Sequence, residues 1–161
     1  MADLLVRLYD LPACPQRDDV TVRHAMAYEK RAVLNWVTEH FGAGWASECD
    51  AAFSRLPVSC FLATSGGEIL GFACYEATAR GFFGPIGVQK DCRGRDLGRA
   101  LVLACLHAMR SLGYAYAVIG GGSGKVDFYA KCAEVLPIPG SEPGVYRDML
   151  ANAREEIRSI S

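Results

Sequence analysis

The segment from residue 84 to residue 98 has the residue types and spacing of an anion site. An apolar stretch leads into a basic turn that contains Gly94, and this turn leads into an apolar helical pattern. The first turn of a helix presents backbone N–H groups without intrahelical partners at the positive end of the helix dipole. Glycine lets a ligand approach the backbone, and Arg93, Arg95 and Arg99 add positive charge. The segment therefore predicts a turn that holds phosphate groups.

A second glycine-rich segment, Gly120 to Lys125, also follows an apolar run and precedes a helical pattern. It does not match a nucleoside triphosphate P-loop, because Ile119 replaces the first glycine and Val126 replaces the serine or threonine after the lysine. The seven cysteines are scattered, with no CxxC pair and no histidine at metal-ligand spacing. The sequence pattern predicts neither a metal site nor a cysteine hydrolase.

The elements that must position the basic turn are strands and helices. We expect strands at 4–8, 58–64, 69–76, 82–88 and 114–119, and helices at 23–40, 45–53, 96–112 and 125–134. Prolines and glycines between 135 and 146 indicate short strands and turns. The helix at 96–112 is apolar around most of its surface, so it must be largely buried. Strand, helix and strand in this order imply a parallel pair with a right-handed crossover.

Composition indicates one globular domain covering residues 1–161. Hydrophobic residues make up 51% and charged residues 22% of the chain, as in ordinary soluble proteins. The formal net charge of −1 provides no global field for a nucleic acid. No apolar run approaches the roughly 20 residues of a membrane span, and no secretory signal is recognised. Scattered, unpaired cysteines indicate reduced thiols, so we expect a cytoplasmic protein without nucleic-acid or membrane partners.

The hexapeptide from Arg93 to Gly98 resembles the signature of the GNAT superfamily of N-acetyltransferases: arginine or glutamine, two residues, glycine, one residue, then glycine or alanine. The resemblance implies an α/β (α+β) fold with a mixed, mostly antiparallel twisted sheet, a central parallel pair of splayed strands, and flanking helices. It also implies acetyl-CoA as the acetyl donor. The implied cofactor-binding residues are Ile86, Gly87, Val88, Arg93, Gly94, Arg95, Asp96, Leu97, Gly98 and Arg99.

The resemblance also implies two catalytic residues. Asp127-Phe128-Tyr129 is similar to the family's helix whose tyrosine protonates the departing thiolate, which makes Tyr129 the candidate acid. The family's general base is variable and is often a carboxylate on the strand before the cofactor loop. Glu76 occupies such a place and would face the mouth where the central strands separate. Glu48 and His107 are weaker candidates.

Two positions depart from the family pattern. Asp96 replaces the inner glycine, so its carboxylate would either cap the helix and compete with phosphate or point outward and leave the backbone cradle intact. Gly122 replaces an asparagine that is common in the family. An N-acetyltransferase acting on a primary amine by direct attack is the expected function, and a non-catalytic acyl-CoA-binding sensor on the same fold is the alternative. The acceptor would be a small-molecule or peptide amine, and a homodimer is implied only by the resemblance.

Overall fold

The computed structural model describes residues 1–158, in which the strands form one sheet in the order β2-β3-β4-β5-β6-β1-β7. The strands are β1 (Leu4–Arg7), β2 (Thr21–His24), β3 (Cys60–Ser65), β4 (Glu68–Tyr75), β5 (Phe82–Val88), β6 (Tyr116–Ile119) and β7 (Val135–Pro137). The α-helices are α1 (Lys30–Phe41), α2 (Ala43–Ala52), α3 (Leu97–Ser111), α4 (Val126–Ala130) and α5 (Ala151–Arg158). Short 3-10 helices are η1 (Ala27–Glu29), η2 (Lys90–Cys92), η3 (Gly122–Lys125) and η4 (Gly144–Tyr146).

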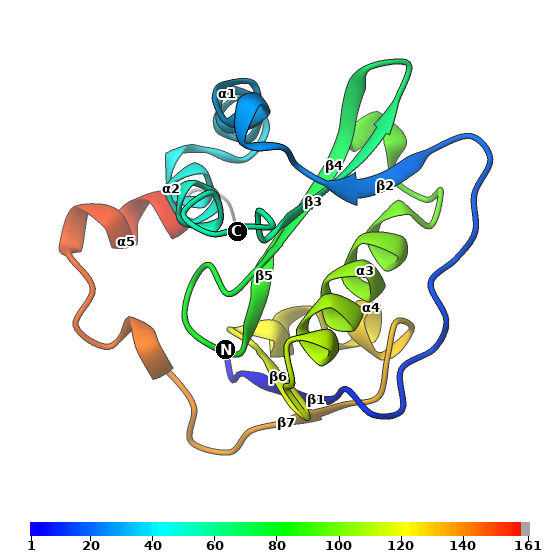
Figure 1. The fold of residues 1–161 in the computed structure, drawn as a ribbon. Coiled ribbons are helices and arrows are strands. Elements are labelled where there is room, and N and C mark those ends of the chain that lie inside the picture. Colours follow the sequence, from blue (N-terminus) through cyan, green and yellow to red (C-terminus); the bar gives the residue numbers. More distant parts are fainter. Residues whose placement is uncertain (159–161) are drawn as a thin grey trace.

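The helices form layers on both faces of the sheet. Helices α1 and α2 cover one face, and α3 covers the other (Figure 1). Val33 and Val37 of α1, spaced by one helical turn, are fully buried against the first face. Leu101 and Cys105 of α3 repeat the same spacing on the second face, also fully buried. None of the helices within residues 1–158 is long and apolar enough to span a membrane.

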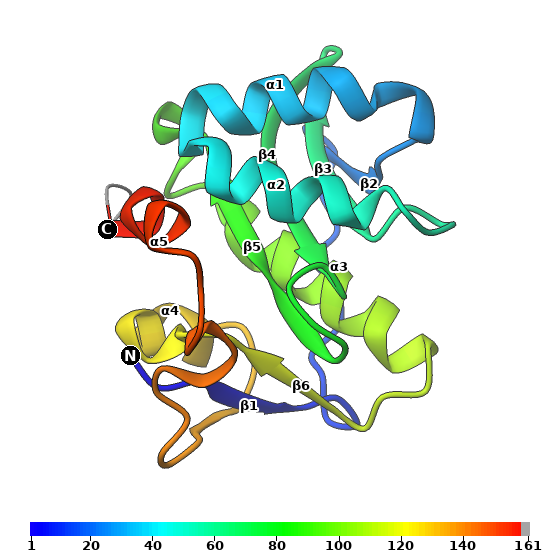
Figure 2. The same cartoon turned by 90° about the vertical axis from the view of Figure 1, so that its left-hand side faces the viewer.

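Strands β5 and β6 form the parallel pair, and only the first two residues of β5 and the last two of β6 are paired. Phe82 pairs with Val118 and Phe83 with Ile119, after which the two strands diverge (Figure 2). The other neighbouring strands are antiparallel. The expected mixed, mostly antiparallel sheet with a central splayed pair flanked by helices is therefore confirmed.

Strand β1 lies between β6 and β7 and is antiparallel to both. Leu4 is opposite Ile119 on one side and Pro137 on the other, and both Leu4 and Val6 are fully buried. The alternating apolar residues of the sequence predict strand β1, but they do not predict which strands pair with it. The chain must then cross the molecule from β1 to reach β2 at the opposite edge of the sheet.

Two predicted helices need correction, and one helix was missed. The helix expected at 23–40 begins only at residue 30, because residues 21–24 pair with β3 as strand β2. The helix expected at 125–134 is divided into the short elements η3 and α4. Helix α5 was not predicted, since its apolar pattern is weak. Strand β2 depends on pairing with a distant part of the chain, so no local signal could separate it from the helix that follows.

Candidate active site

The N-terminus of α3 has the backbone geometry expected of the predicted phosphate cradle, whose role in cofactor binding stays a prediction. The turn before it holds two residues in the left-handed region, Gly94 at φ +78° and Asp96 at φ +62°. The carbonyl of Asp96 accepts the first helical hydrogen bond, from the N–H of Ala100 at 3.1 Å. The N–H groups of Leu97, Gly98 and Arg99 precede that bond and have no intrahelical acceptor. They form the cradle that an anion would occupy.

Asp96 occupies a backbone conformation that favours glycine. A φ near +60° costs little for glycine and is tolerated by aspartate more readily than by most residues. Its side chain makes no capping hydrogen bond, is 55% exposed, and pairs with the Arg99 guanidinium at 3.8 Å. The carboxylate therefore points outward, and the backbone cradle remains intact.

The arginines around the cradle are held by the protein. Arg93 donates to the carbonyl of Val88 at 3.2 Å, and Arg99 donates to the carbonyl of Lys131 at 3.2 Å. Arg95 donates to Asp19 at 3.0 Å, and Arg17 also binds Asp19. Hydrogen bonds from Arg17 and then Arg95 lower the pKa of Asp19 to about 2. Each guanidinium has five donors, so these contacts position the charges and leave further N–H groups for a ligand.

The predicted cofactor strand presents an unpaired edge. Val88 pairs with Gly71 of β4, but from residue 84 onward β5 has no strand on its β6 side in the described part of the chain. Backbone N–H and C=O groups on that edge can pair with the amides of an extended ligand. Gly87 faces α1, where a Cβ would lie 2.5 Å from the Phe41 ring. Glycine is thus required here for close packing beneath the edge.

Tyr129 lies where β5 and β6 begin to separate. Its ring stands edge-on to Phe83, the last residue of β5 that pairs with β6, with centroids 6.2 Å apart. The side chain is 7% exposed on the α3 side of the sheet. Burial raises the pKa of Tyr129 to about 12, so the phenol keeps its proton at neutral pH. Tyr129 is thus a protonated phenol beside the point of separation, and its role as the catalytic acid stays a prediction.

Glu76 lies at the closed end of the parallel pair and not at its mouth. Its backbone N–H donates to the carbonyl of Phe82, in the region where β5 and β6 are still paired. Its carboxylate accepts hydrogen bonds from Tyr114 at 3.0 Å, from Arg55 at 3.1 Å and from the backbone N–H of Gly81. These contacts give Glu76 a structural role in the β4–β5 connection, and its catalytic role stays a prediction.

A second carboxylate, Glu48 of α2, is connected to the end of β6 through Tyr146. It accepts a hydrogen bond from Thr78 at 2.9 Å. The hydroxyl of Tyr146 lies 3.6 Å from the position of a Cβ on Gly120, the residue that follows β6. Burial raises the pKa of Glu48, and hydrogen bonds with Thr78 and Tyr146 offset this rise in part. Residues 48, 78 and 146 meet only in the fold, so sequence spacing gave no signal for the cluster.

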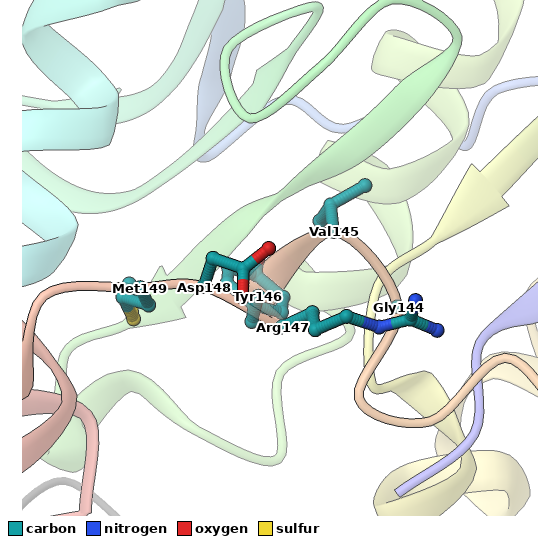
Figure 3. A pocket seen from close by; sticks show the side chains of 6 residues that line it. All are labelled: Gly144, Val145, Tyr146, Arg147, Asp148 and Met149. Atoms are coloured by element: carbon teal, nitrogen blue, oxygen red, sulfur yellow. The ribbon is translucent and has the colours of Figure 1, made fainter.

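The segment that carries Tyr146 also lines a hollow. Gly144 to Met149 line an open hollow of about 460 Å³, and Figure 3 shows these six residues along their segment. A larger hollow of about 700 Å³ lies between α3 and the β1–β2 connection. Glu48 and Tyr129 line neither hollow, but Tyr146, the neighbour of Glu48, lines the smaller one. We therefore associate the smaller one with the candidate active site.

The family model described as "Acetyltransferase (GNAT) family" matches residues 30–133, which is more than half of the chain. The chain belongs to the GNAT acetyltransferase family. The predicted resemblance is thereby confirmed. The GNAT family uses acetyl-CoA, so the predicted acetyl donor is also confirmed at the level of the family. No curated protein matches the sequence.

Solved GNAT structures share the fold at low sequence identity. A glucosamine N-acetyltransferase region of a fungal multi-domain β-N-acetylglucosaminidase has a TM-score of 0.66 and 13% identity, over 84% of this chain and 20% of that one. A GCN5-related N-acetyltransferase from Sphaerobacter thermophilus has a TM-score of 0.55 and 18% identity, over 96% and 46%. The Escherichia coli acetyltransferase YhbS, in complex with CoA, has a TM-score of 0.56 and 17% identity, over 75% and 71%. This chain spans less than half of the first two proteins.

The packing of β1 against Gly122 explains one departure of this chain from the family pattern. A Cβ on Gly122 would lie 2.9 Å from Ile119 and 3.0 Å from Leu4. Leu4 belongs to β1, which lies next to β6 and fills this space. A larger residue such as asparagine would therefore require the side chains of Leu4 and Ile119 to shift. Gly122 is a packing requirement of the arrangement of strands in this chain.

Proposed function

We propose that this chain transfers the acetyl group of acetyl-CoA to a primary amine. One observation carries the proposal: Tyr129 and Glu48 lie on opposite faces of the sheet, beside the point where β5 and β6 separate. The α3 cradle and the free edge of β5 lead to the same point. A proton acceptor on one side of the opening and a proton donor on the other suit acetyl transfer, because the acceptor amine loses a proton and the departing thiolate gains one.

The proposed roles follow from the protonation states of the two side chains. Bound acetyl-CoA supplies a thioester from which an amine can take the acetyl group. Glu48 holds the incoming ammonium and removes its proton, because a half-buried carboxylate with a raised pKa is a stronger base than an exposed one. Tyr129 gives its proton to the departing sulfur. Tyr146 remains protonated, since burial raises its pKa to about 12, and it orients Glu48 by hydrogen bonding.

Glu76 remains the second candidate for the base. Its carboxylate is 4% exposed and is already engaged by Arg55, so proton transfer through it would require these contacts to open. We favour Glu48 for this reason. The pair Glu48→Gln and Glu76→Gln separates the candidates. If a carboxylate is the base, its glutamine variant should lose turnover and keep the stability of the wild type. If a carboxylate is structural, its glutamine variant should lose stability.

The acceptor is proposed to be a small-molecule amine, with a peptide amine as the alternative. The hollow of about 460 Å³ beside Tyr146 has the volume of a small-ligand site. One structural neighbour is a glucosamine N-acetyltransferase region, which supports an acceptor of this size. The cysteines of the described residues are free thiols, which supports the proposed location in the reducing cytoplasm.

Turnover of acetyl-CoA with a panel of amines tests the proposal. We expect acetylated product from at least one amine, with CoA release that depends on the amine. Calorimetric titration with CoA in parallel measures binding. Binding without any acetylated product would favour the non-catalytic acyl-CoA-binding sensor. Absence of binding at millimolar CoA would contradict both functions.

A further inference from the structure

Three cysteine thiols from separate elements converge inside the protein. Cys49 lies on α2, Cys60 begins β3, and Cys74 lies near the end of β4, directly opposite Cys60 in the antiparallel register. Their sulfur atoms all lie within 4.8 Å of one another, and those of Cys49 and Cys60 are 4.0 Å apart. All three side chains are fully buried. The separation of 4.0 Å is about twice a disulfide bond, so these groups are thiols.

The convergence distinguishes these thiols from the other buried cysteines. A single buried cysteine commonly acts as a small apolar residue. Cys105 and Cys132 fit that description, since each donates to one backbone carbonyl, at 3.5 and 3.4 Å. The thiols of Cys49, Cys60 and Cys74 instead surround one point. They form the one such group of potential metal ligands in residues 1–158.

The sulfur separation suits three-fold coordination of a single ion. Three sulfurs at about 2.3 Å from one ion lie about 4.0 Å apart when the group is planar and about 3.4 Å apart when it is pyramidal. The Cys49 and Cys60 sulfurs, now 4.0 Å apart, would have to approach by about 0.6 Å to bind a pyramidal ion. No histidine, carboxylate or fourth cysteine of the described residues joins the group. Thiolates select soft, thiophilic ions. The geometry therefore points to a thiophilic ion that is satisfied by three ligands.

The charge of the surroundings narrows the choice of ion. The site lies in the core between α2 and the sheet, next to apolar residues that include Phe72 and Leu62. An uncompensated charge in such surroundings is costly. Three thiolates leave a net charge of −1 with a divalent ion and −2 with a monovalent ion, but none with a trivalent ion. Trivalent arsenic forms three bonds to sulfur and needs no fourth ligand.

We propose that Cys49, Cys60 and Cys74 form a buried three-thiolate site for a trivalent metalloid, As(III). In the binding reaction, arsenous acid and three thiols give an arsenic trithiolate and three waters. Three As–O bonds break and three As–S bonds form, and each thiol proton leaves with one hydroxide as water. No oxidation state changes, so no oxidant or reductant is needed. The bound arsenic would link α2 to β3 and β4.

Native mass spectrometry of the full chain with sodium arsenite tests the site. The experiment uses the Cys14→Ser background, because Cys14 is the exposed cysteine, and a phosphine reductant that contains no thiol. We expect one arsenic per chain with the loss of three protons. We also expect Cys60→Ser to weaken binding at least about tenfold, or about 1.4 kcal/mol. Cys105→Ser and Cys132→Ser are matched controls that should bind as the background protein does.

Several results would overturn the proposal. One is the absence of an arsenic adduct at millimolar arsenite. Another is an adduct that persists with equal affinity in Cys60→Ser, or that is lost in Cys132→Ser. Tighter binding of Zn²⁺ than of arsenite would contradict the assignment of a trivalent ion. If Cys60→Ser does not fold, Cys74→Ala is used in its place, with melting temperature recorded for every variant.

Discussion

The close approach of α1 to the cofactor strand makes Gly87→Ala a sensitive perturbation of the candidate site. The added methyl carbon would lie 2.5, 2.6 and 2.8 Å from three carbons of the Phe41 ring. Comfortable carbon contacts are about 3.5–4.0 Å, so the ring or the strand must move by about 1 Å. Gly87 lies in the part of β5 whose free edge we propose to bind acetyl-CoA. A shift of the strand should therefore affect both stability and cofactor affinity.

The size of the effect follows from the surroundings of Phe41. Its ring is stacked on Trp45 at a centroid distance of 5.4 Å and packs against Trp36 and Phe72, each at 5.7 Å. Such a ring has little room to move, and inserting a methyl group into a packed core costs about 1–3 kcal/mol. For a domain of this size each kcal/mol lowers the melting temperature by about 2–4 °C. We expect a decrease of about 2–12 °C.

Urea unfolding and CoA titration of four proteins measure the effect: wild type, Gly87→Ala, Phe41→Leu and the double variant. The smaller leucine makes room for the methyl group, so the double variant should be more stable than the sum of the single effects predicts, by about 1 kcal/mol or more. An unchanged melting temperature in Gly87→Ala, or strictly additive effects in the double variant, would refute the packing argument.

Four further predictions concern the site itself. Asp96→Gly should tighten CoA binding in calorimetry, because it removes a negative charge near the phosphates at a backbone position suited to glycine, and weaker binding would contradict this reasoning. Glu48→Gln should lower kcat at least about tenfold, and wild-type kcat should decrease as the pH falls through the raised pKa of Glu48. Burial penalises the charged form of Glu48, so the penalty on folding stability is absent at low pH and grows as the pH rises through the folded-state pKa. Glu48→Gln should therefore raise the melting temperature at pH 8 but not at pH 4. The same shift in melting temperature at both pH values would exclude burial of the charge as the cause. Tyr129→Phe should lower kcat at least about tenfold with little change in CoA affinity, and full turnover with chemistry rate-limiting would make Tyr129 a packing residue.

The sequence predicted the parts of the site that lie close together in the chain. The basic turn, the buried helix α3 and the strand β5 form one continuous segment whose residues carry the family signature. Local sequence patterns are sufficient to predict this part of the site, because backbone groups that are adjacent in the chain form the cradle. The outward direction of Asp96 was left open by the sequence, since it depends on a backbone angle and on the position of Arg99.

The acceptor side could not be predicted in the same way. Glu48, Thr78 and Tyr146 belong to three separate segments and become neighbours only through the packing of α2 and η4 around the sheet. Glu76 was favoured because it ends a strand, but a strand end can lie at either end of a splayed pair. The register between β5 and β6 decides which end opens, and that register is a long-range property.

The position of β1 sets an order of events during synthesis. This strand is made before the other strands of the sheet, yet both of its neighbours, β6 and β7, are made after β2 to β5. Until they are available, Leu4 and Val6 have no native strand to pair with, and an unpaired apolar strand can associate with other chains. Strands β2 to β5 can pair with one another before that time. The strand of the sheet that is made earliest is therefore among the last to be fixed, and the nascent chain must keep it from other partners in the meantime.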